Sequence, residues 1–360
     1  MRQAREWVLR PGMTRPGMCL TLPGEHHTGM EMATNKKKLL ITQSMAKVGW
    51  DLLRERGDIE PVQFPGTITT PDFRALLAQH APVNGVALGI TPFGEAEIAA
   101  AREMQVVARI GVGYDAVDVP ALTNRKIPLM VAGSANSPSV AEQAMFMMMT
   151  LAKRGAELNT MVQANQWNKR MSALPVDLFG KTVLIVGFGR IGTRTAKRCQ
   201  AMEMNVLVYD PYKSAAEIEG AGCQPVSNLD RALPKADFVT VHCPKTPETV
   251  GMFNSTRLAR MRPTAYLVNT ARGGIIDEPA LYAALSSGKL AGAGLDVYEK
   301  EPVQPDNPLL TLGNVVSAPH MAGVTKESLD RMGLQTARNI LSALDGKPIR
   351  ENVVNPEVLD

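Results

Sequence analysis

The chain has 360 residues, 45% of them apolar and 21% charged, a composition typical of a globular protein and a length that predicts two domains. Its 39 basic and 35 acidic residues give a net charge of +4, and the single dense basic run at residues 36–38 argues against nucleic acid as a partner. No apolar run reaches the ~18 residues of a membrane span and the four cysteines form no CxxC pair, so we expect a cytoplasmic protein with reduced thiols and no bound metal or membrane contact.

Residues 1–35 are predicted to form an irregular N-terminal tail. They hold four arginines with several prolines and glycines, and they lack the apolar core of a signal peptide. A transit peptide is disfavoured because the segment also holds acidic residues. Met30 and Met32 stand just before the first predicted strand, so we expect translation to begin there and residues 1–29 to be absent from the native protein.

From Leu39 onward, short runs of Val, Ile and Leu alternate with segments of helix length. This alternation is typical of parallel sheets with helices on both faces, so the fold class is predicted as α/β with two doubly wound parallel sheets. The predicted strands of the first half are Leu39–Thr42, Gly85–Ile90, Gln105–Ile110 and Pro128–Val131. Those of the second half are Thr182–Gly187, Asn205–Asp210, Phe238–Cys243, Ala265–Thr270, Gly292–Val297 and Asn314–Ala318.

A long apolar helix is predicted between the two halves, over residues 139–154 with the sequence SVAEQAMFMMMTLAKR. Ser139 is expected as its N-cap and Glu142 at its third helical position. The helix should be buried and should connect the two domains. Its methionines are interpreted as core residues rather than as a metal or partner site: Met145, Met147, Met148 and Met149.

A glycine fingerprint follows the predicted strand at residues 182–187 and opens a helix. Gly187 allows the tight turn, Gly189 lets a pyrophosphate approach the backbone, and Gly192 lets the helix pack closely on the strand. The free N–H groups and the helix dipole then bind phosphate. Glycines that only form a turn need no particular context. Here the preceding strand, the spacing of the glycines and the following helix all match a dinucleotide-binding loop.

Asp210 ends the next predicted strand, where a carboxylate accepts hydrogen bonds from the ribose hydroxyls and repels a 2′-phosphate. NAD is therefore favoured over NADP. Lys213 is a nearby cation that would help the protein to tolerate NADP. Arg190, inside the glycine loop, would add a positive charge beside the pyrophosphate.

Three later segments place polar residues at predicted strand ends, where an open α/β sheet binds its ligands. His320 is the candidate base for a hydroxyl proton, because imidazole titrates near neutral pH. Glu301 is its candidate partner, since a carboxylate fixes the ring tautomer and favours the imidazolium. The planar guanidinium of Arg272 matches a carboxylate and polarises a neighbouring carbonyl. Together they predict hydride transfer to or from a small 2-hydroxy acid.

Each of these residues alone has a plainer interpretation. A lone histidine that follows a proline is often structural, and Arg272, beside two glycines, can cap a helix. His242 is expected to line the cofactor cleft rather than to react. Glu299 and Asp296 accompany Glu301 in one segment, and Glu299 has the simpler interpretation of a solvated neighbour.

Further motifs accompany these segments, namely RIGVGYDAVDV (109–119), SVAE (139–142) and HCPKTPET (242–249). With GFGRIG (187–192), NTARGGIID (269–277), LDVYEKEP (295–302) and PHMAG (319–323), they closely resemble the D-isomer-specific 2-hydroxyacid dehydrogenase family. That family includes phosphoglycerate, glycerate, lactate and hydroxypyruvate enzymes. The resemblance runs from about Leu39 to Val354 and is to the phosphoglycerate-dehydrogenase-like short form.

The resemblance implies roles for individual residues. Arg272, Glu301 and His320 would be the catalytic triad. The substrate carboxylate would be received by the backbone of Gly111, Val112 and Gly113, with Arg109 and Arg272 nearby. Asp296 would bind the nicotinamide carboxamide. The complete set of implied cofactor contacts is Gly187, Gly189, Arg190, Ile191, Gly192, Asp210, His242, Pro244, Thr249, Thr270, Ala271, Arg272, Asp296, His320 and Gly323.

The resemblance also implies a discontinuous domain arrangement. Residues 36–138 and 318–345 would form a flavodoxin-like substrate domain, and 139–317 the Rossmann cofactor domain, with a C-terminal tail at 346–360. A crevice between the domains would close on the substrate. Two subunits would pair as a homodimer through cofactor-domain surfaces that include the long helix.

Departures from the family pattern bear on the substrate. Animal phosphoglycerate enzymes carry an arginine in the loop where this chain has Gly89, and a charge-assisted phosphate contact is thereby lost, although Arg109 remains. The segment VAGSANSP (131–138) lacks the usual Asn-Thr-Pro, and no regulatory domain is expected after Val354. An unphosphorylated acid such as glyoxylate, hydroxypyruvate or a bulkier 2-keto acid is therefore preferred to 3-phosphoglycerate.

Two other functions are weighed on the same fold. Nucleotide-sensing corepressors bind peptide motifs, but the balanced charge and the lack of interaction tails argue against that role. A formate dehydrogenase pairs its histidine with glutamine, whereas this chain offers the carboxylate of Glu301.

Overall fold

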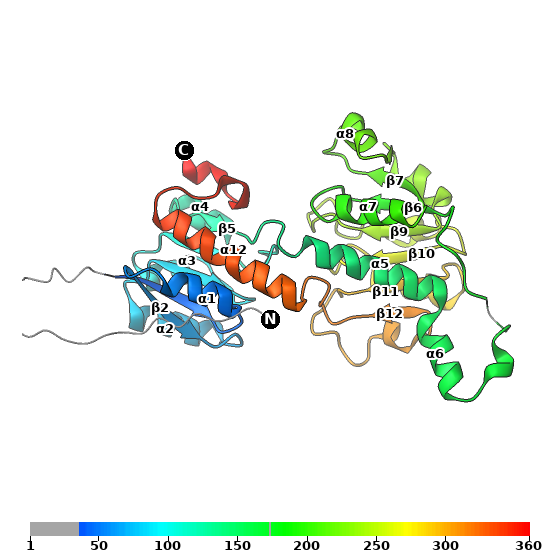
Figure 1. Ribbon diagram of the computed structural model, residues 1–360, viewed down its shortest axis with the longest axis horizontal. Coiled ribbons are helices and arrows are strands. Elements are labelled where there is room, and N and C mark those ends of the chain that lie inside the picture. The colour runs from blue at the N-terminus through cyan, green and yellow to red at the C-terminus, as the bar shows by residue number, and fades with distance from the viewer. Residues whose placement is uncertain (1–35, 173) are drawn as a thin grey trace, which may run out of the picture. The chain divides into compact units, whose positions relative to one another are not determined.

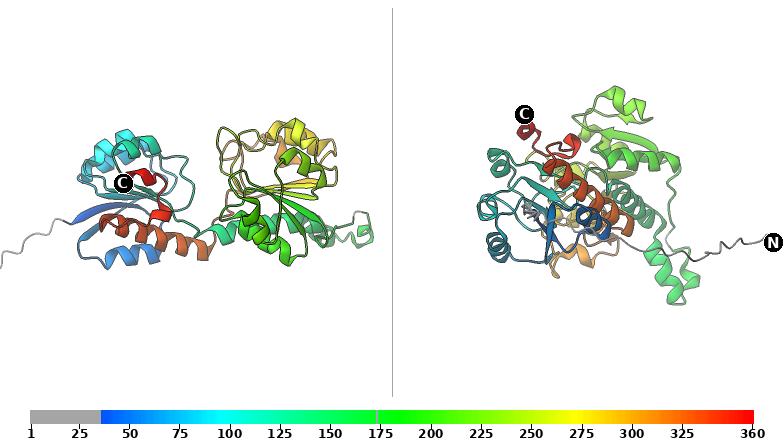
Figure 2. Two further views of the ribbon diagram at one scale, coloured as in Figure 1. Left: turned by 90° about the horizontal axis from the view of Figure 1, so that it is seen from above. Right: turned by 60° about the vertical axis from the view of Figure 1, so that its left-hand side comes forward.

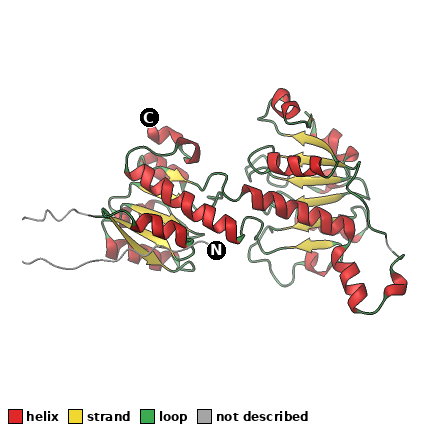
Figure 3. Cartoon of the chain, viewed as in Figure 1, coloured by secondary structure: helices red, strands yellow, loops and turns green. Residues whose placement is uncertain are grey.

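The computed structural model describes residues 36–172 and 174–360 (Figure 1). The predictions for residues 1–35, which concern the tail and the start of translation, lie outside the described residues. The described chain consists of parallel strands and of helices that pack on them (Figure 3). None of its described helices combines the length and the apolar character that crossing a lipid bilayer demands.

The first sheet has five parallel strands in the order β2-β1-β3-β4-β5. This 2-1-3-4-5 order is the flavodoxin-like one, so the predicted class of this sheet is confirmed. The four predicted strands are present, each end within two residues of its predicted position, and β2 is additional. The strands are β1 (Lys37–Thr42), β2 (Ile59–Phe64), β3 (Gly85–Leu88), β4 (Val106–Arg109) and β5 (Leu129–Met130).

Helices cover both faces of the first sheet (Figure 2, left). One face packs against α2 (Thr70–His80), α3 (Glu95–Ala101) and α4 (Val119–Asn124). The other face packs against α1 (Lys47–Arg54) and α12 (Lys326–Leu344), which returns from near the end of the chain. Helices α1 and α12 approach each other closely at Gly49, which has no side chain. A Cβ there would lie only 2.5 Å from the carbonyl oxygen of Gly333.

The end of the chain runs along β5. The N–H of Val131 donates to the carbonyl of Asn352 (2.9 Å), and the N–H of Val354 donates to the carbonyl of Leu129 (2.8 Å). The predicted C-terminal tail at 346–360 therefore includes a segment that is hydrogen-bonded to the first sheet.

The second sheet has seven parallel strands in the order β12-β11-β10-β9-β6-β7-β8. Counted from β6, this is the Rossmann order 3-2-1-4-5-6 with a seventh strand beyond it, so the predicted Rossmann class is confirmed. Every predicted strand end lies within two residues of the observed one, and the short β8 is additional. The strands are β6 (Thr182–Val186), β7 (Asn205–Tyr209), β8 (Gln224–Pro225), β9 (Phe238–Val241), β10 (Tyr266–Asn269), β11 (Gly292–Leu295) and β12 (Val315–Ser317).

Helices also cover both faces of the second sheet (Figure 2, left). On one face lie α5 (Ser137–Lys153), α7 (Gly192–Ala201) and α8 (Ala215–Gly220). On the other lie α9 (Leu229–Ala232), α10 (Ser255–Leu258) and α11 (Glu278–Ser286). Helix α6 (Gly155–Gln163) follows α5 and buries none of its residues.

Helix α5 begins earlier than predicted. Asn136 is its N-cap residue and Pro138 lies in its first turn, so Ser139 lies inside the helix, where its hydroxyl is 3.3 Å from that of Thr325. The prediction of Ser139 as the N-cap is wrong because a proline, with no N–H and a fixed φ, suits the first turn of a helix. Glu142 accordingly pairs with a side chain of α7 and not with the start of α5.

The methionines of α5 pack in the core, as predicted. Met147 and Met148 are fully buried against the second sheet, and Met145 and Met149 are partly buried against the same cluster. Phe146 is an exception on this helix, because 56% of its surface is exposed.

Candidate active site

The loop after β6 is shaped by three glycines with different surroundings. Gly187 has φ 97°, and a Cβ there would lie 2.6 Å from the backbone nitrogen of Cys243. At Gly192, the first residue of α7, a Cβ would overlap the carbonyl oxygen of Gly187. Gly189 has no atom within 4 Å of the position of a Cβ. The loop is thus tightly packed at its ends and open in its middle, which fits the approach of a pyrophosphate.

The other residues of this loop also fit a phosphate ligand. Among the described residues, the backbone N–H groups of Gly189, Arg190 and Ile191 have no protein acceptor. Ile191 precedes α7, so these donors lie at the positive end of a helix. The guanidinium of Arg190 donates to the carbonyl of Glu351 (2.9 Å).

Asp210 follows β7 and holds the glycine loop in place. Its Oδ2 accepts the N–H of Phe188 (2.7 Å), and its Oδ1 accepts the N–H of Tyr212 (2.8 Å). Lys213, the cation near the predicted ribose site, is paired with Glu217 at 2.9 Å, and this hydrogen bond raises the pKa of Lys213. The ion-pair contact of Lys213 is therefore with Glu217 and not with Asp210.

The segment after β9 contributes a neutral histidine. Nε2 of His242 lies 3.0 Å from the hydroxyl of Thr240, whereas its buried Nδ1 has no partner among the described residues. Burial lowers the pKa of His242 to about 3, so the ring is uncharged near neutral pH. Thr249 closes the following turn, because its hydroxyl donates to the carbonyl of Pro244 (2.7 Å) and accepts the N–H of Thr246 (2.7 Å).

The loop after β10 is fixed by Asn269. Its side-chain oxygen accepts the N–H of Ala271 (2.9 Å), and its side-chain nitrogen donates to the carbonyl of Arg272 (2.9 Å). Thr270 is buried, and its hydroxyl has no partner in the described parts of the chain. An unpaired buried hydroxyl is costly in a folded protein, so Thr270 is suited to a hydrogen bond with a ligand.

Arg272 is held between its own loop and the loop after β4. Its Nε donates to Oδ2 of Asp115 (3.1 Å), and its Nη1 donates to the carbonyl of Ala271 (2.7 Å). Gly113 is in direct contact, because a Cβ there would overlap Nη2 of Arg272. Burial raises the pKa of Asp115, but the charge and hydrogen bond of Arg272 outweigh it, and the net pKa is lowered. The ion pair therefore persists at neutral pH.

The loop after β4 turns its carbonyls toward the protein. The carbonyl of Gly111 accepts the N–H of Ala132 (2.7 Å), and that of Gly113 accepts Nε of Arg109 (2.8 Å). The backbone N–H groups of Gly111, Val112 and Gly113 have no acceptor within the part of the chain that the structure describes. Successive free N–H groups beside a guanidinium suit a carboxylate.

His320 follows β12 with φ 56°, and its Nδ1 lies 2.6 Å from Oε2 of Glu301. The other carboxylate oxygen of Glu301 accepts the N–H of Tyr298 (3.0 Å). The imidazole remains accessible, since 47% of the His320 side chain is exposed. With Nδ1 donating to the carboxylate, Nε2 of the neutral ring is the free acceptor.

Asp296 organises the segment around His320. It is 1% exposed, and its two oxygens accept the N–H groups of Met321 and Ala322, both at 2.8 Å. Its carbonyl accepts the N–H of His320 (2.8 Å). Burial raises the pKa of Asp296 although these hydrogen bonds oppose the shift. The nicotinamide contact stays a prediction, because the structure shows Asp296 binding backbone.

Two residues were not assigned from the sequence. Asp115 lies within the RIGVGYDAVDV motif, but only the fold brings it to Arg272. Asn136 is the N-cap residue of α5, and its buried side-chain oxygen has no partner among the residues described. Its nitrogen would lie 2.8 Å from a Cβ on Gly323, so any larger residue would crowd Asn136. No local pattern in the sequence indicates either contact.

The strand order brings the chemical groups to one edge of the second sheet. Arg272 follows β10, Asp296 follows β11 and His320 follows β12, and these three strands are neighbours. The carboxyl ends of parallel strands share one edge, which is where such sheets bind ligands. The same sheet therefore carries a dinucleotide-binding loop, a guanidinium that can bind a carboxylate, and an imidazole paired with Glu301. These groups together suit the oxidation of an alcohol or the reduction of a carbonyl.

Comparisons with known proteins agree with this chemistry. The family model described as D-isomer specific 2-hydroxyacid dehydrogenase, NAD binding domain, matches residues 145–322. The D-3-phosphoglycerate dehydrogenase of Archaeoglobus fulgidus is 37% identical over 324 residues, which are 89% of this chain and 60% of that one. The TT0316 protein of Thermus thermophilus has a TM-score of 0.79 at 31% identity, with 88% of this chain and 99% of that one covered. A glyoxylate reductase from Paecilomyes thermophila has a TM-score of 0.80 at 29% identity, with 89% and 99% covered.

The matched family model covers the glycine loop, and NAD is therefore the dinucleotide that the comparisons support. The chain spans between 52% and 60% of the length of the curated D-3-phosphoglycerate dehydrogenases that it matches. In sequence and in fold, the chain belongs to the D-isomer-specific 2-hydroxyacid dehydrogenase family.

Proposed function

We propose that this chain is an NAD-dependent D-2-hydroxyacid dehydrogenase that interconverts a small D-2-hydroxy acid and its 2-keto acid. The observation that carries the proposal is the 2.6 Å contact between Nδ1 of His320 and Glu301, on the sheet edge that also bears Arg272. The D configuration follows from family membership, since the matched family model is that of D-isomer specific enzymes.

In the proposed mechanism NAD, when bound, supplies or accepts the hydride. His320 exchanges the proton through Nε2, because Nδ1 is bound to Glu301. The carboxylate of Glu301 stabilises the imidazolium, which is the acid needed for reduction. Arg272 binds the substrate carboxylate and polarises the adjacent carbonyl. The free N–H groups at residues 111–113 bind the same carboxylate.

The substrate is proposed to be an unphosphorylated acid of the glyoxylate or hydroxypyruvate type. The relatives' names point instead to 3-phosphoglycerate, but the chain matches only part of those proteins. At the end of β3 stands Gly89, which offers no cation, and the guanidinium of Arg109 is directed at backbone carbonyls. A phosphate carries a charge of about −2 and is usually bound by free cations.

The test is a substrate screen followed by NADH absorbance. The 2-keto acids to be compared are glyoxylate, hydroxypyruvate, a branched 2-keto acid and 3-phosphohydroxypyruvate, each with NADH and with NADPH as the reductant. D- and L-2-hydroxy acids are tested in the oxidative direction. We expect at least one unphosphorylated acid to exceed 3-phosphohydroxypyruvate in kcat/KM by about tenfold, which is ~1.4 kcal/mol of transition-state binding. The reverse order overturns the substrate proposal alone. Tight NAD binding without turnover of any acid overturns the proposal that the chain is an enzyme, and it favours a nucleotide-sensing binding protein.

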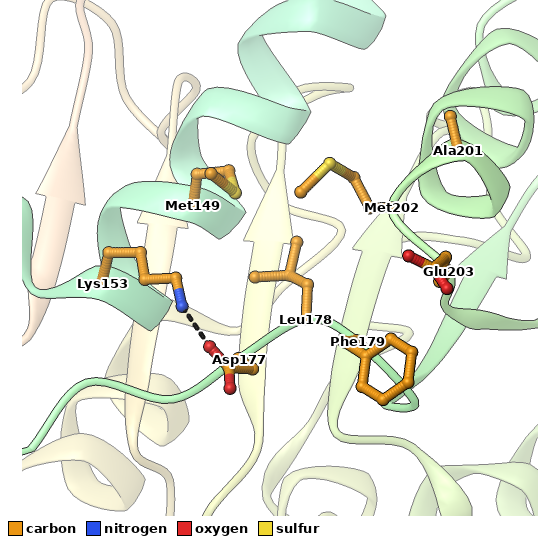
Figure 4. Close-up of a pocket in the computed structure, with 8 residues that line it drawn as sticks. All are labelled: Met149, Lys153, Asp177, Leu178, Phe179, Ala201, Met202 and Glu203. Carbon is orange, nitrogen blue, oxygen red and sulfur yellow. Dashed lines mark hydrogen bonds and ion pairs between the residues drawn. The ribbon is translucent and has the colours of Figure 1, made fainter.

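We further infer a homodimer that forms through the second sheet's helices α5 and α6 and the segment after them. This stretch exposes large apolar side chains, namely Phe146, Val162, Trp167, Met171, Leu174, Val176 and Phe179. Phe179 and Met202 line a hollow of about 240 Å³, together with Met149 and the Lys153–Asp177 ion pair. These side chains are drawn in Figure 4. Large apolar side chains exposed in such number along one stretch of the chain are usually covered by a partner, and the family resemblance makes a second copy the expected one.

Light scattering of the full chain at micromolar concentration tests the dimer. The double variant Trp167→Glu with Phe179→Glu should be monomeric, because two charges would be buried in each copy of the interface. Tyr212→Glu is the matched control, since Tyr212 is 88% exposed and stands outside this stretch, after β7. A monomeric wild-type protein would refute the dimer.

A further inference from the structure

Arg109 is a charged residue with two guanidinium nitrogens that donate to backbone carbonyls. It ends β4, and its Nε donates to the carbonyl of Gly113 (2.8 Å) while its Nη1 donates to the carbonyl of Leu88 (3.2 Å). Leu88 ends β3, so this one side chain links the loops that follow two neighbouring strands. The fork of an arginine makes these contacts from two separate nitrogens held in one plane, whereas a lysine has a single nitrogen.

The loop that Arg109 holds is pinned at three carbonyls. Those of Gly111 and Gly113 accept from Ala132 and Arg109, and the carbonyl of Arg109 itself accepts the hydroxyl of Thr336 (3.2 Å). With the carbonyls held, the N–H groups at residues 111–113 are presented together, and Gly111 adopts φ 137° to allow the turn. Arg109 therefore fixes the far end of this loop at the carbonyl of Gly113 and ties it to the end of β3.

The charge of Arg109 is retained without an ion-pair contact of its own among the described residues. Burial lowers its pKa to about 10, with Asp115 acting to raise it and Arg272 to lower it, so the guanidinium is still protonated near neutral pH. Asp115 makes its hydrogen bond to Arg272 and not to Arg109. Withdrawing part of a cation from water is costly, and the two hydrogen bonds to carbonyls, one of them in this loop, are the gain that the structure shows for Arg109.

We infer that Arg109 is a positioning residue that sets the shape of the carboxylate-binding loop, and that it does not bind the variable part of the substrate. The inference rests on the proposed function, in which the N–H groups at residues 111–113 receive the substrate carboxylate. Because every 2-keto acid presents the same carboxylate, loss of Arg109 weakens the binding of all of them alike. A residue that bound a phosphate would instead matter for the phosphorylated acid alone.

The experiment compares Arg109→Lys and Arg109→Gln with wild type on each acid that the wild type turns over, with glyoxylate and 3-phosphohydroxypyruvate always included. We expect KM to rise on the order of 10- to 100-fold for each of these acids, because a misplaced binding loop has effects of that size. The rise should be equal among acids to within about twofold, and kcat should change far less, since the same contact is lost in ground and transition states. Affinity for NADH should be unchanged.

The matched control is Arg125→Lys. Arg125 is an exposed residue of the same domain, at the C-cap of α4, and its side chain pairs with Glu95. Its KM values should equal those of the wild type. Added guanidinium ion should lower the KM of Arg109→Gln, a rescue that a general loss of stability would not show. Should the Gln variant fail to fold, the Lys variant, which keeps the charge and loses the fork, gives the decision.

Three results would overturn the inference. These are unchanged KM values in Arg109→Lys, a loss confined to 3-phosphohydroxypyruvate, and a fall in kcat with constant KM. Each leaves the proposed function intact, because the wild type still turns over an acid. Failure of the wild type to act on any acid is the separate outcome that refutes the proposed function, and the inference with it.

Discussion

Nδ1 of His320 and Oε2 of Glu301 lie 2.6 Å apart, and this contact fixes which nitrogen of the imidazole can meet a substrate. Glu301 is itself held, because its second oxygen accepts the N–H of Tyr298. His320 is anchored through its backbone to Asp296. The pair is therefore oriented before any ligand arrives, which is the geometry that acid–base catalysis needs.

Glu301→Gln should reduce the rate of keto-acid reduction about 10- to 100-fold and move the loss of rate at alkaline pH to lower pH. The reason is that a neutral amide stabilises the imidazolium less than a carboxylate does. The measurement is kcat against pH for both enzymes, with NADH binding as the control. A profile that keeps its shape would remove Glu301 from the mechanism.

His320→Ala should abolish measurable hydride transfer, with a loss of roughly 10²- to 10⁴-fold, while the affinity for NAD changes little. The glycine loop, which carries the phosphate-binding groups, is formed by a different part of the sheet. Steady-state rates and the fluorescence of bound NADH are the two readouts. Retention of more than about a tenth of the activity contradicts the proposed base.

Gly189→Ala and Gly192→Ala should fail in different ways. A methyl group at Gly189 meets no atom of the described protein, so the melting temperature without NAD should stay the same while the affinity for NAD falls about tenfold or more. At Gly192 the methyl group would overlap the carbonyl oxygen of Gly187, so Gly192→Ala should lower the melting temperature itself. Equal effects of the two variants on thermal stability would show that the open middle of the loop has no special role.

Asp210→Asn should shift the ratio of kcat/KM for NADPH over NADH upward by about tenfold, because the charge that repels a 2′-phosphate is removed. The amide has a single acceptor oxygen for the N–H groups of Phe188 and Tyr212, so a stability loss of about 1 kcal/mol should accompany the shift. Lys213→Ala is the companion variant and should not raise the ratio, since it removes a positive charge and leaves the carboxylate of Asp210 in place. An unaltered ratio in Asp210→Asn refutes the basis for NAD preference.

His242→Gln should make the protein less sensitive to acid. Burial lowers the folded-state pKa of His242 to about 3 from its ordinary value of 6.5, so between those values the unfolded chain binds a proton that the folded chain does not. Stability therefore falls as pH falls below about 6.5, by at most ~1.4 kcal/mol per pH unit. Urea unfolding at pH 7 and about pH 5 should show a loss that is about 2 kcal/mol smaller in His242→Gln. Parallel losses would mean that His242 is protonated in the folded protein.

The interior strands of both sheets were predictable because their residues are apolar without interruption. β6 and β9 are short apolar runs that are almost entirely buried, a pattern typical of interior strands of a parallel sheet. β2 escaped prediction because its sequence IEPVQF holds a proline and polar residues, as suits a strand at the edge of a sheet. β8 has only two residues and carries no pattern.

Within the site, the groups on one loop were predictable and the contacts between loops were not. Gly187, Gly189 and Gly192 stand in one short motif, so their environments follow from strand, turn and helix. Asp115 and Arg272 are 157 residues apart in sequence. Nothing in either segment alone indicates that contact, because it depends on how two separate sheets are joined by the chain.

The return of α12 to the first sheet has a consequence for the order in which the protein can fold during synthesis. Leu39 and Ile41 of β1 are buried by Ala337 and Ile340 of α12, which emerge from the ribosome about 300 residues later. The strands of the second sheet, between Thr182 and Ser317, are complete before α12 is made. The nascent chain must therefore leave part of one apolar face of its first-made sheet, the part that α1 does not cover, exposed to water while the later-made sheet assembles.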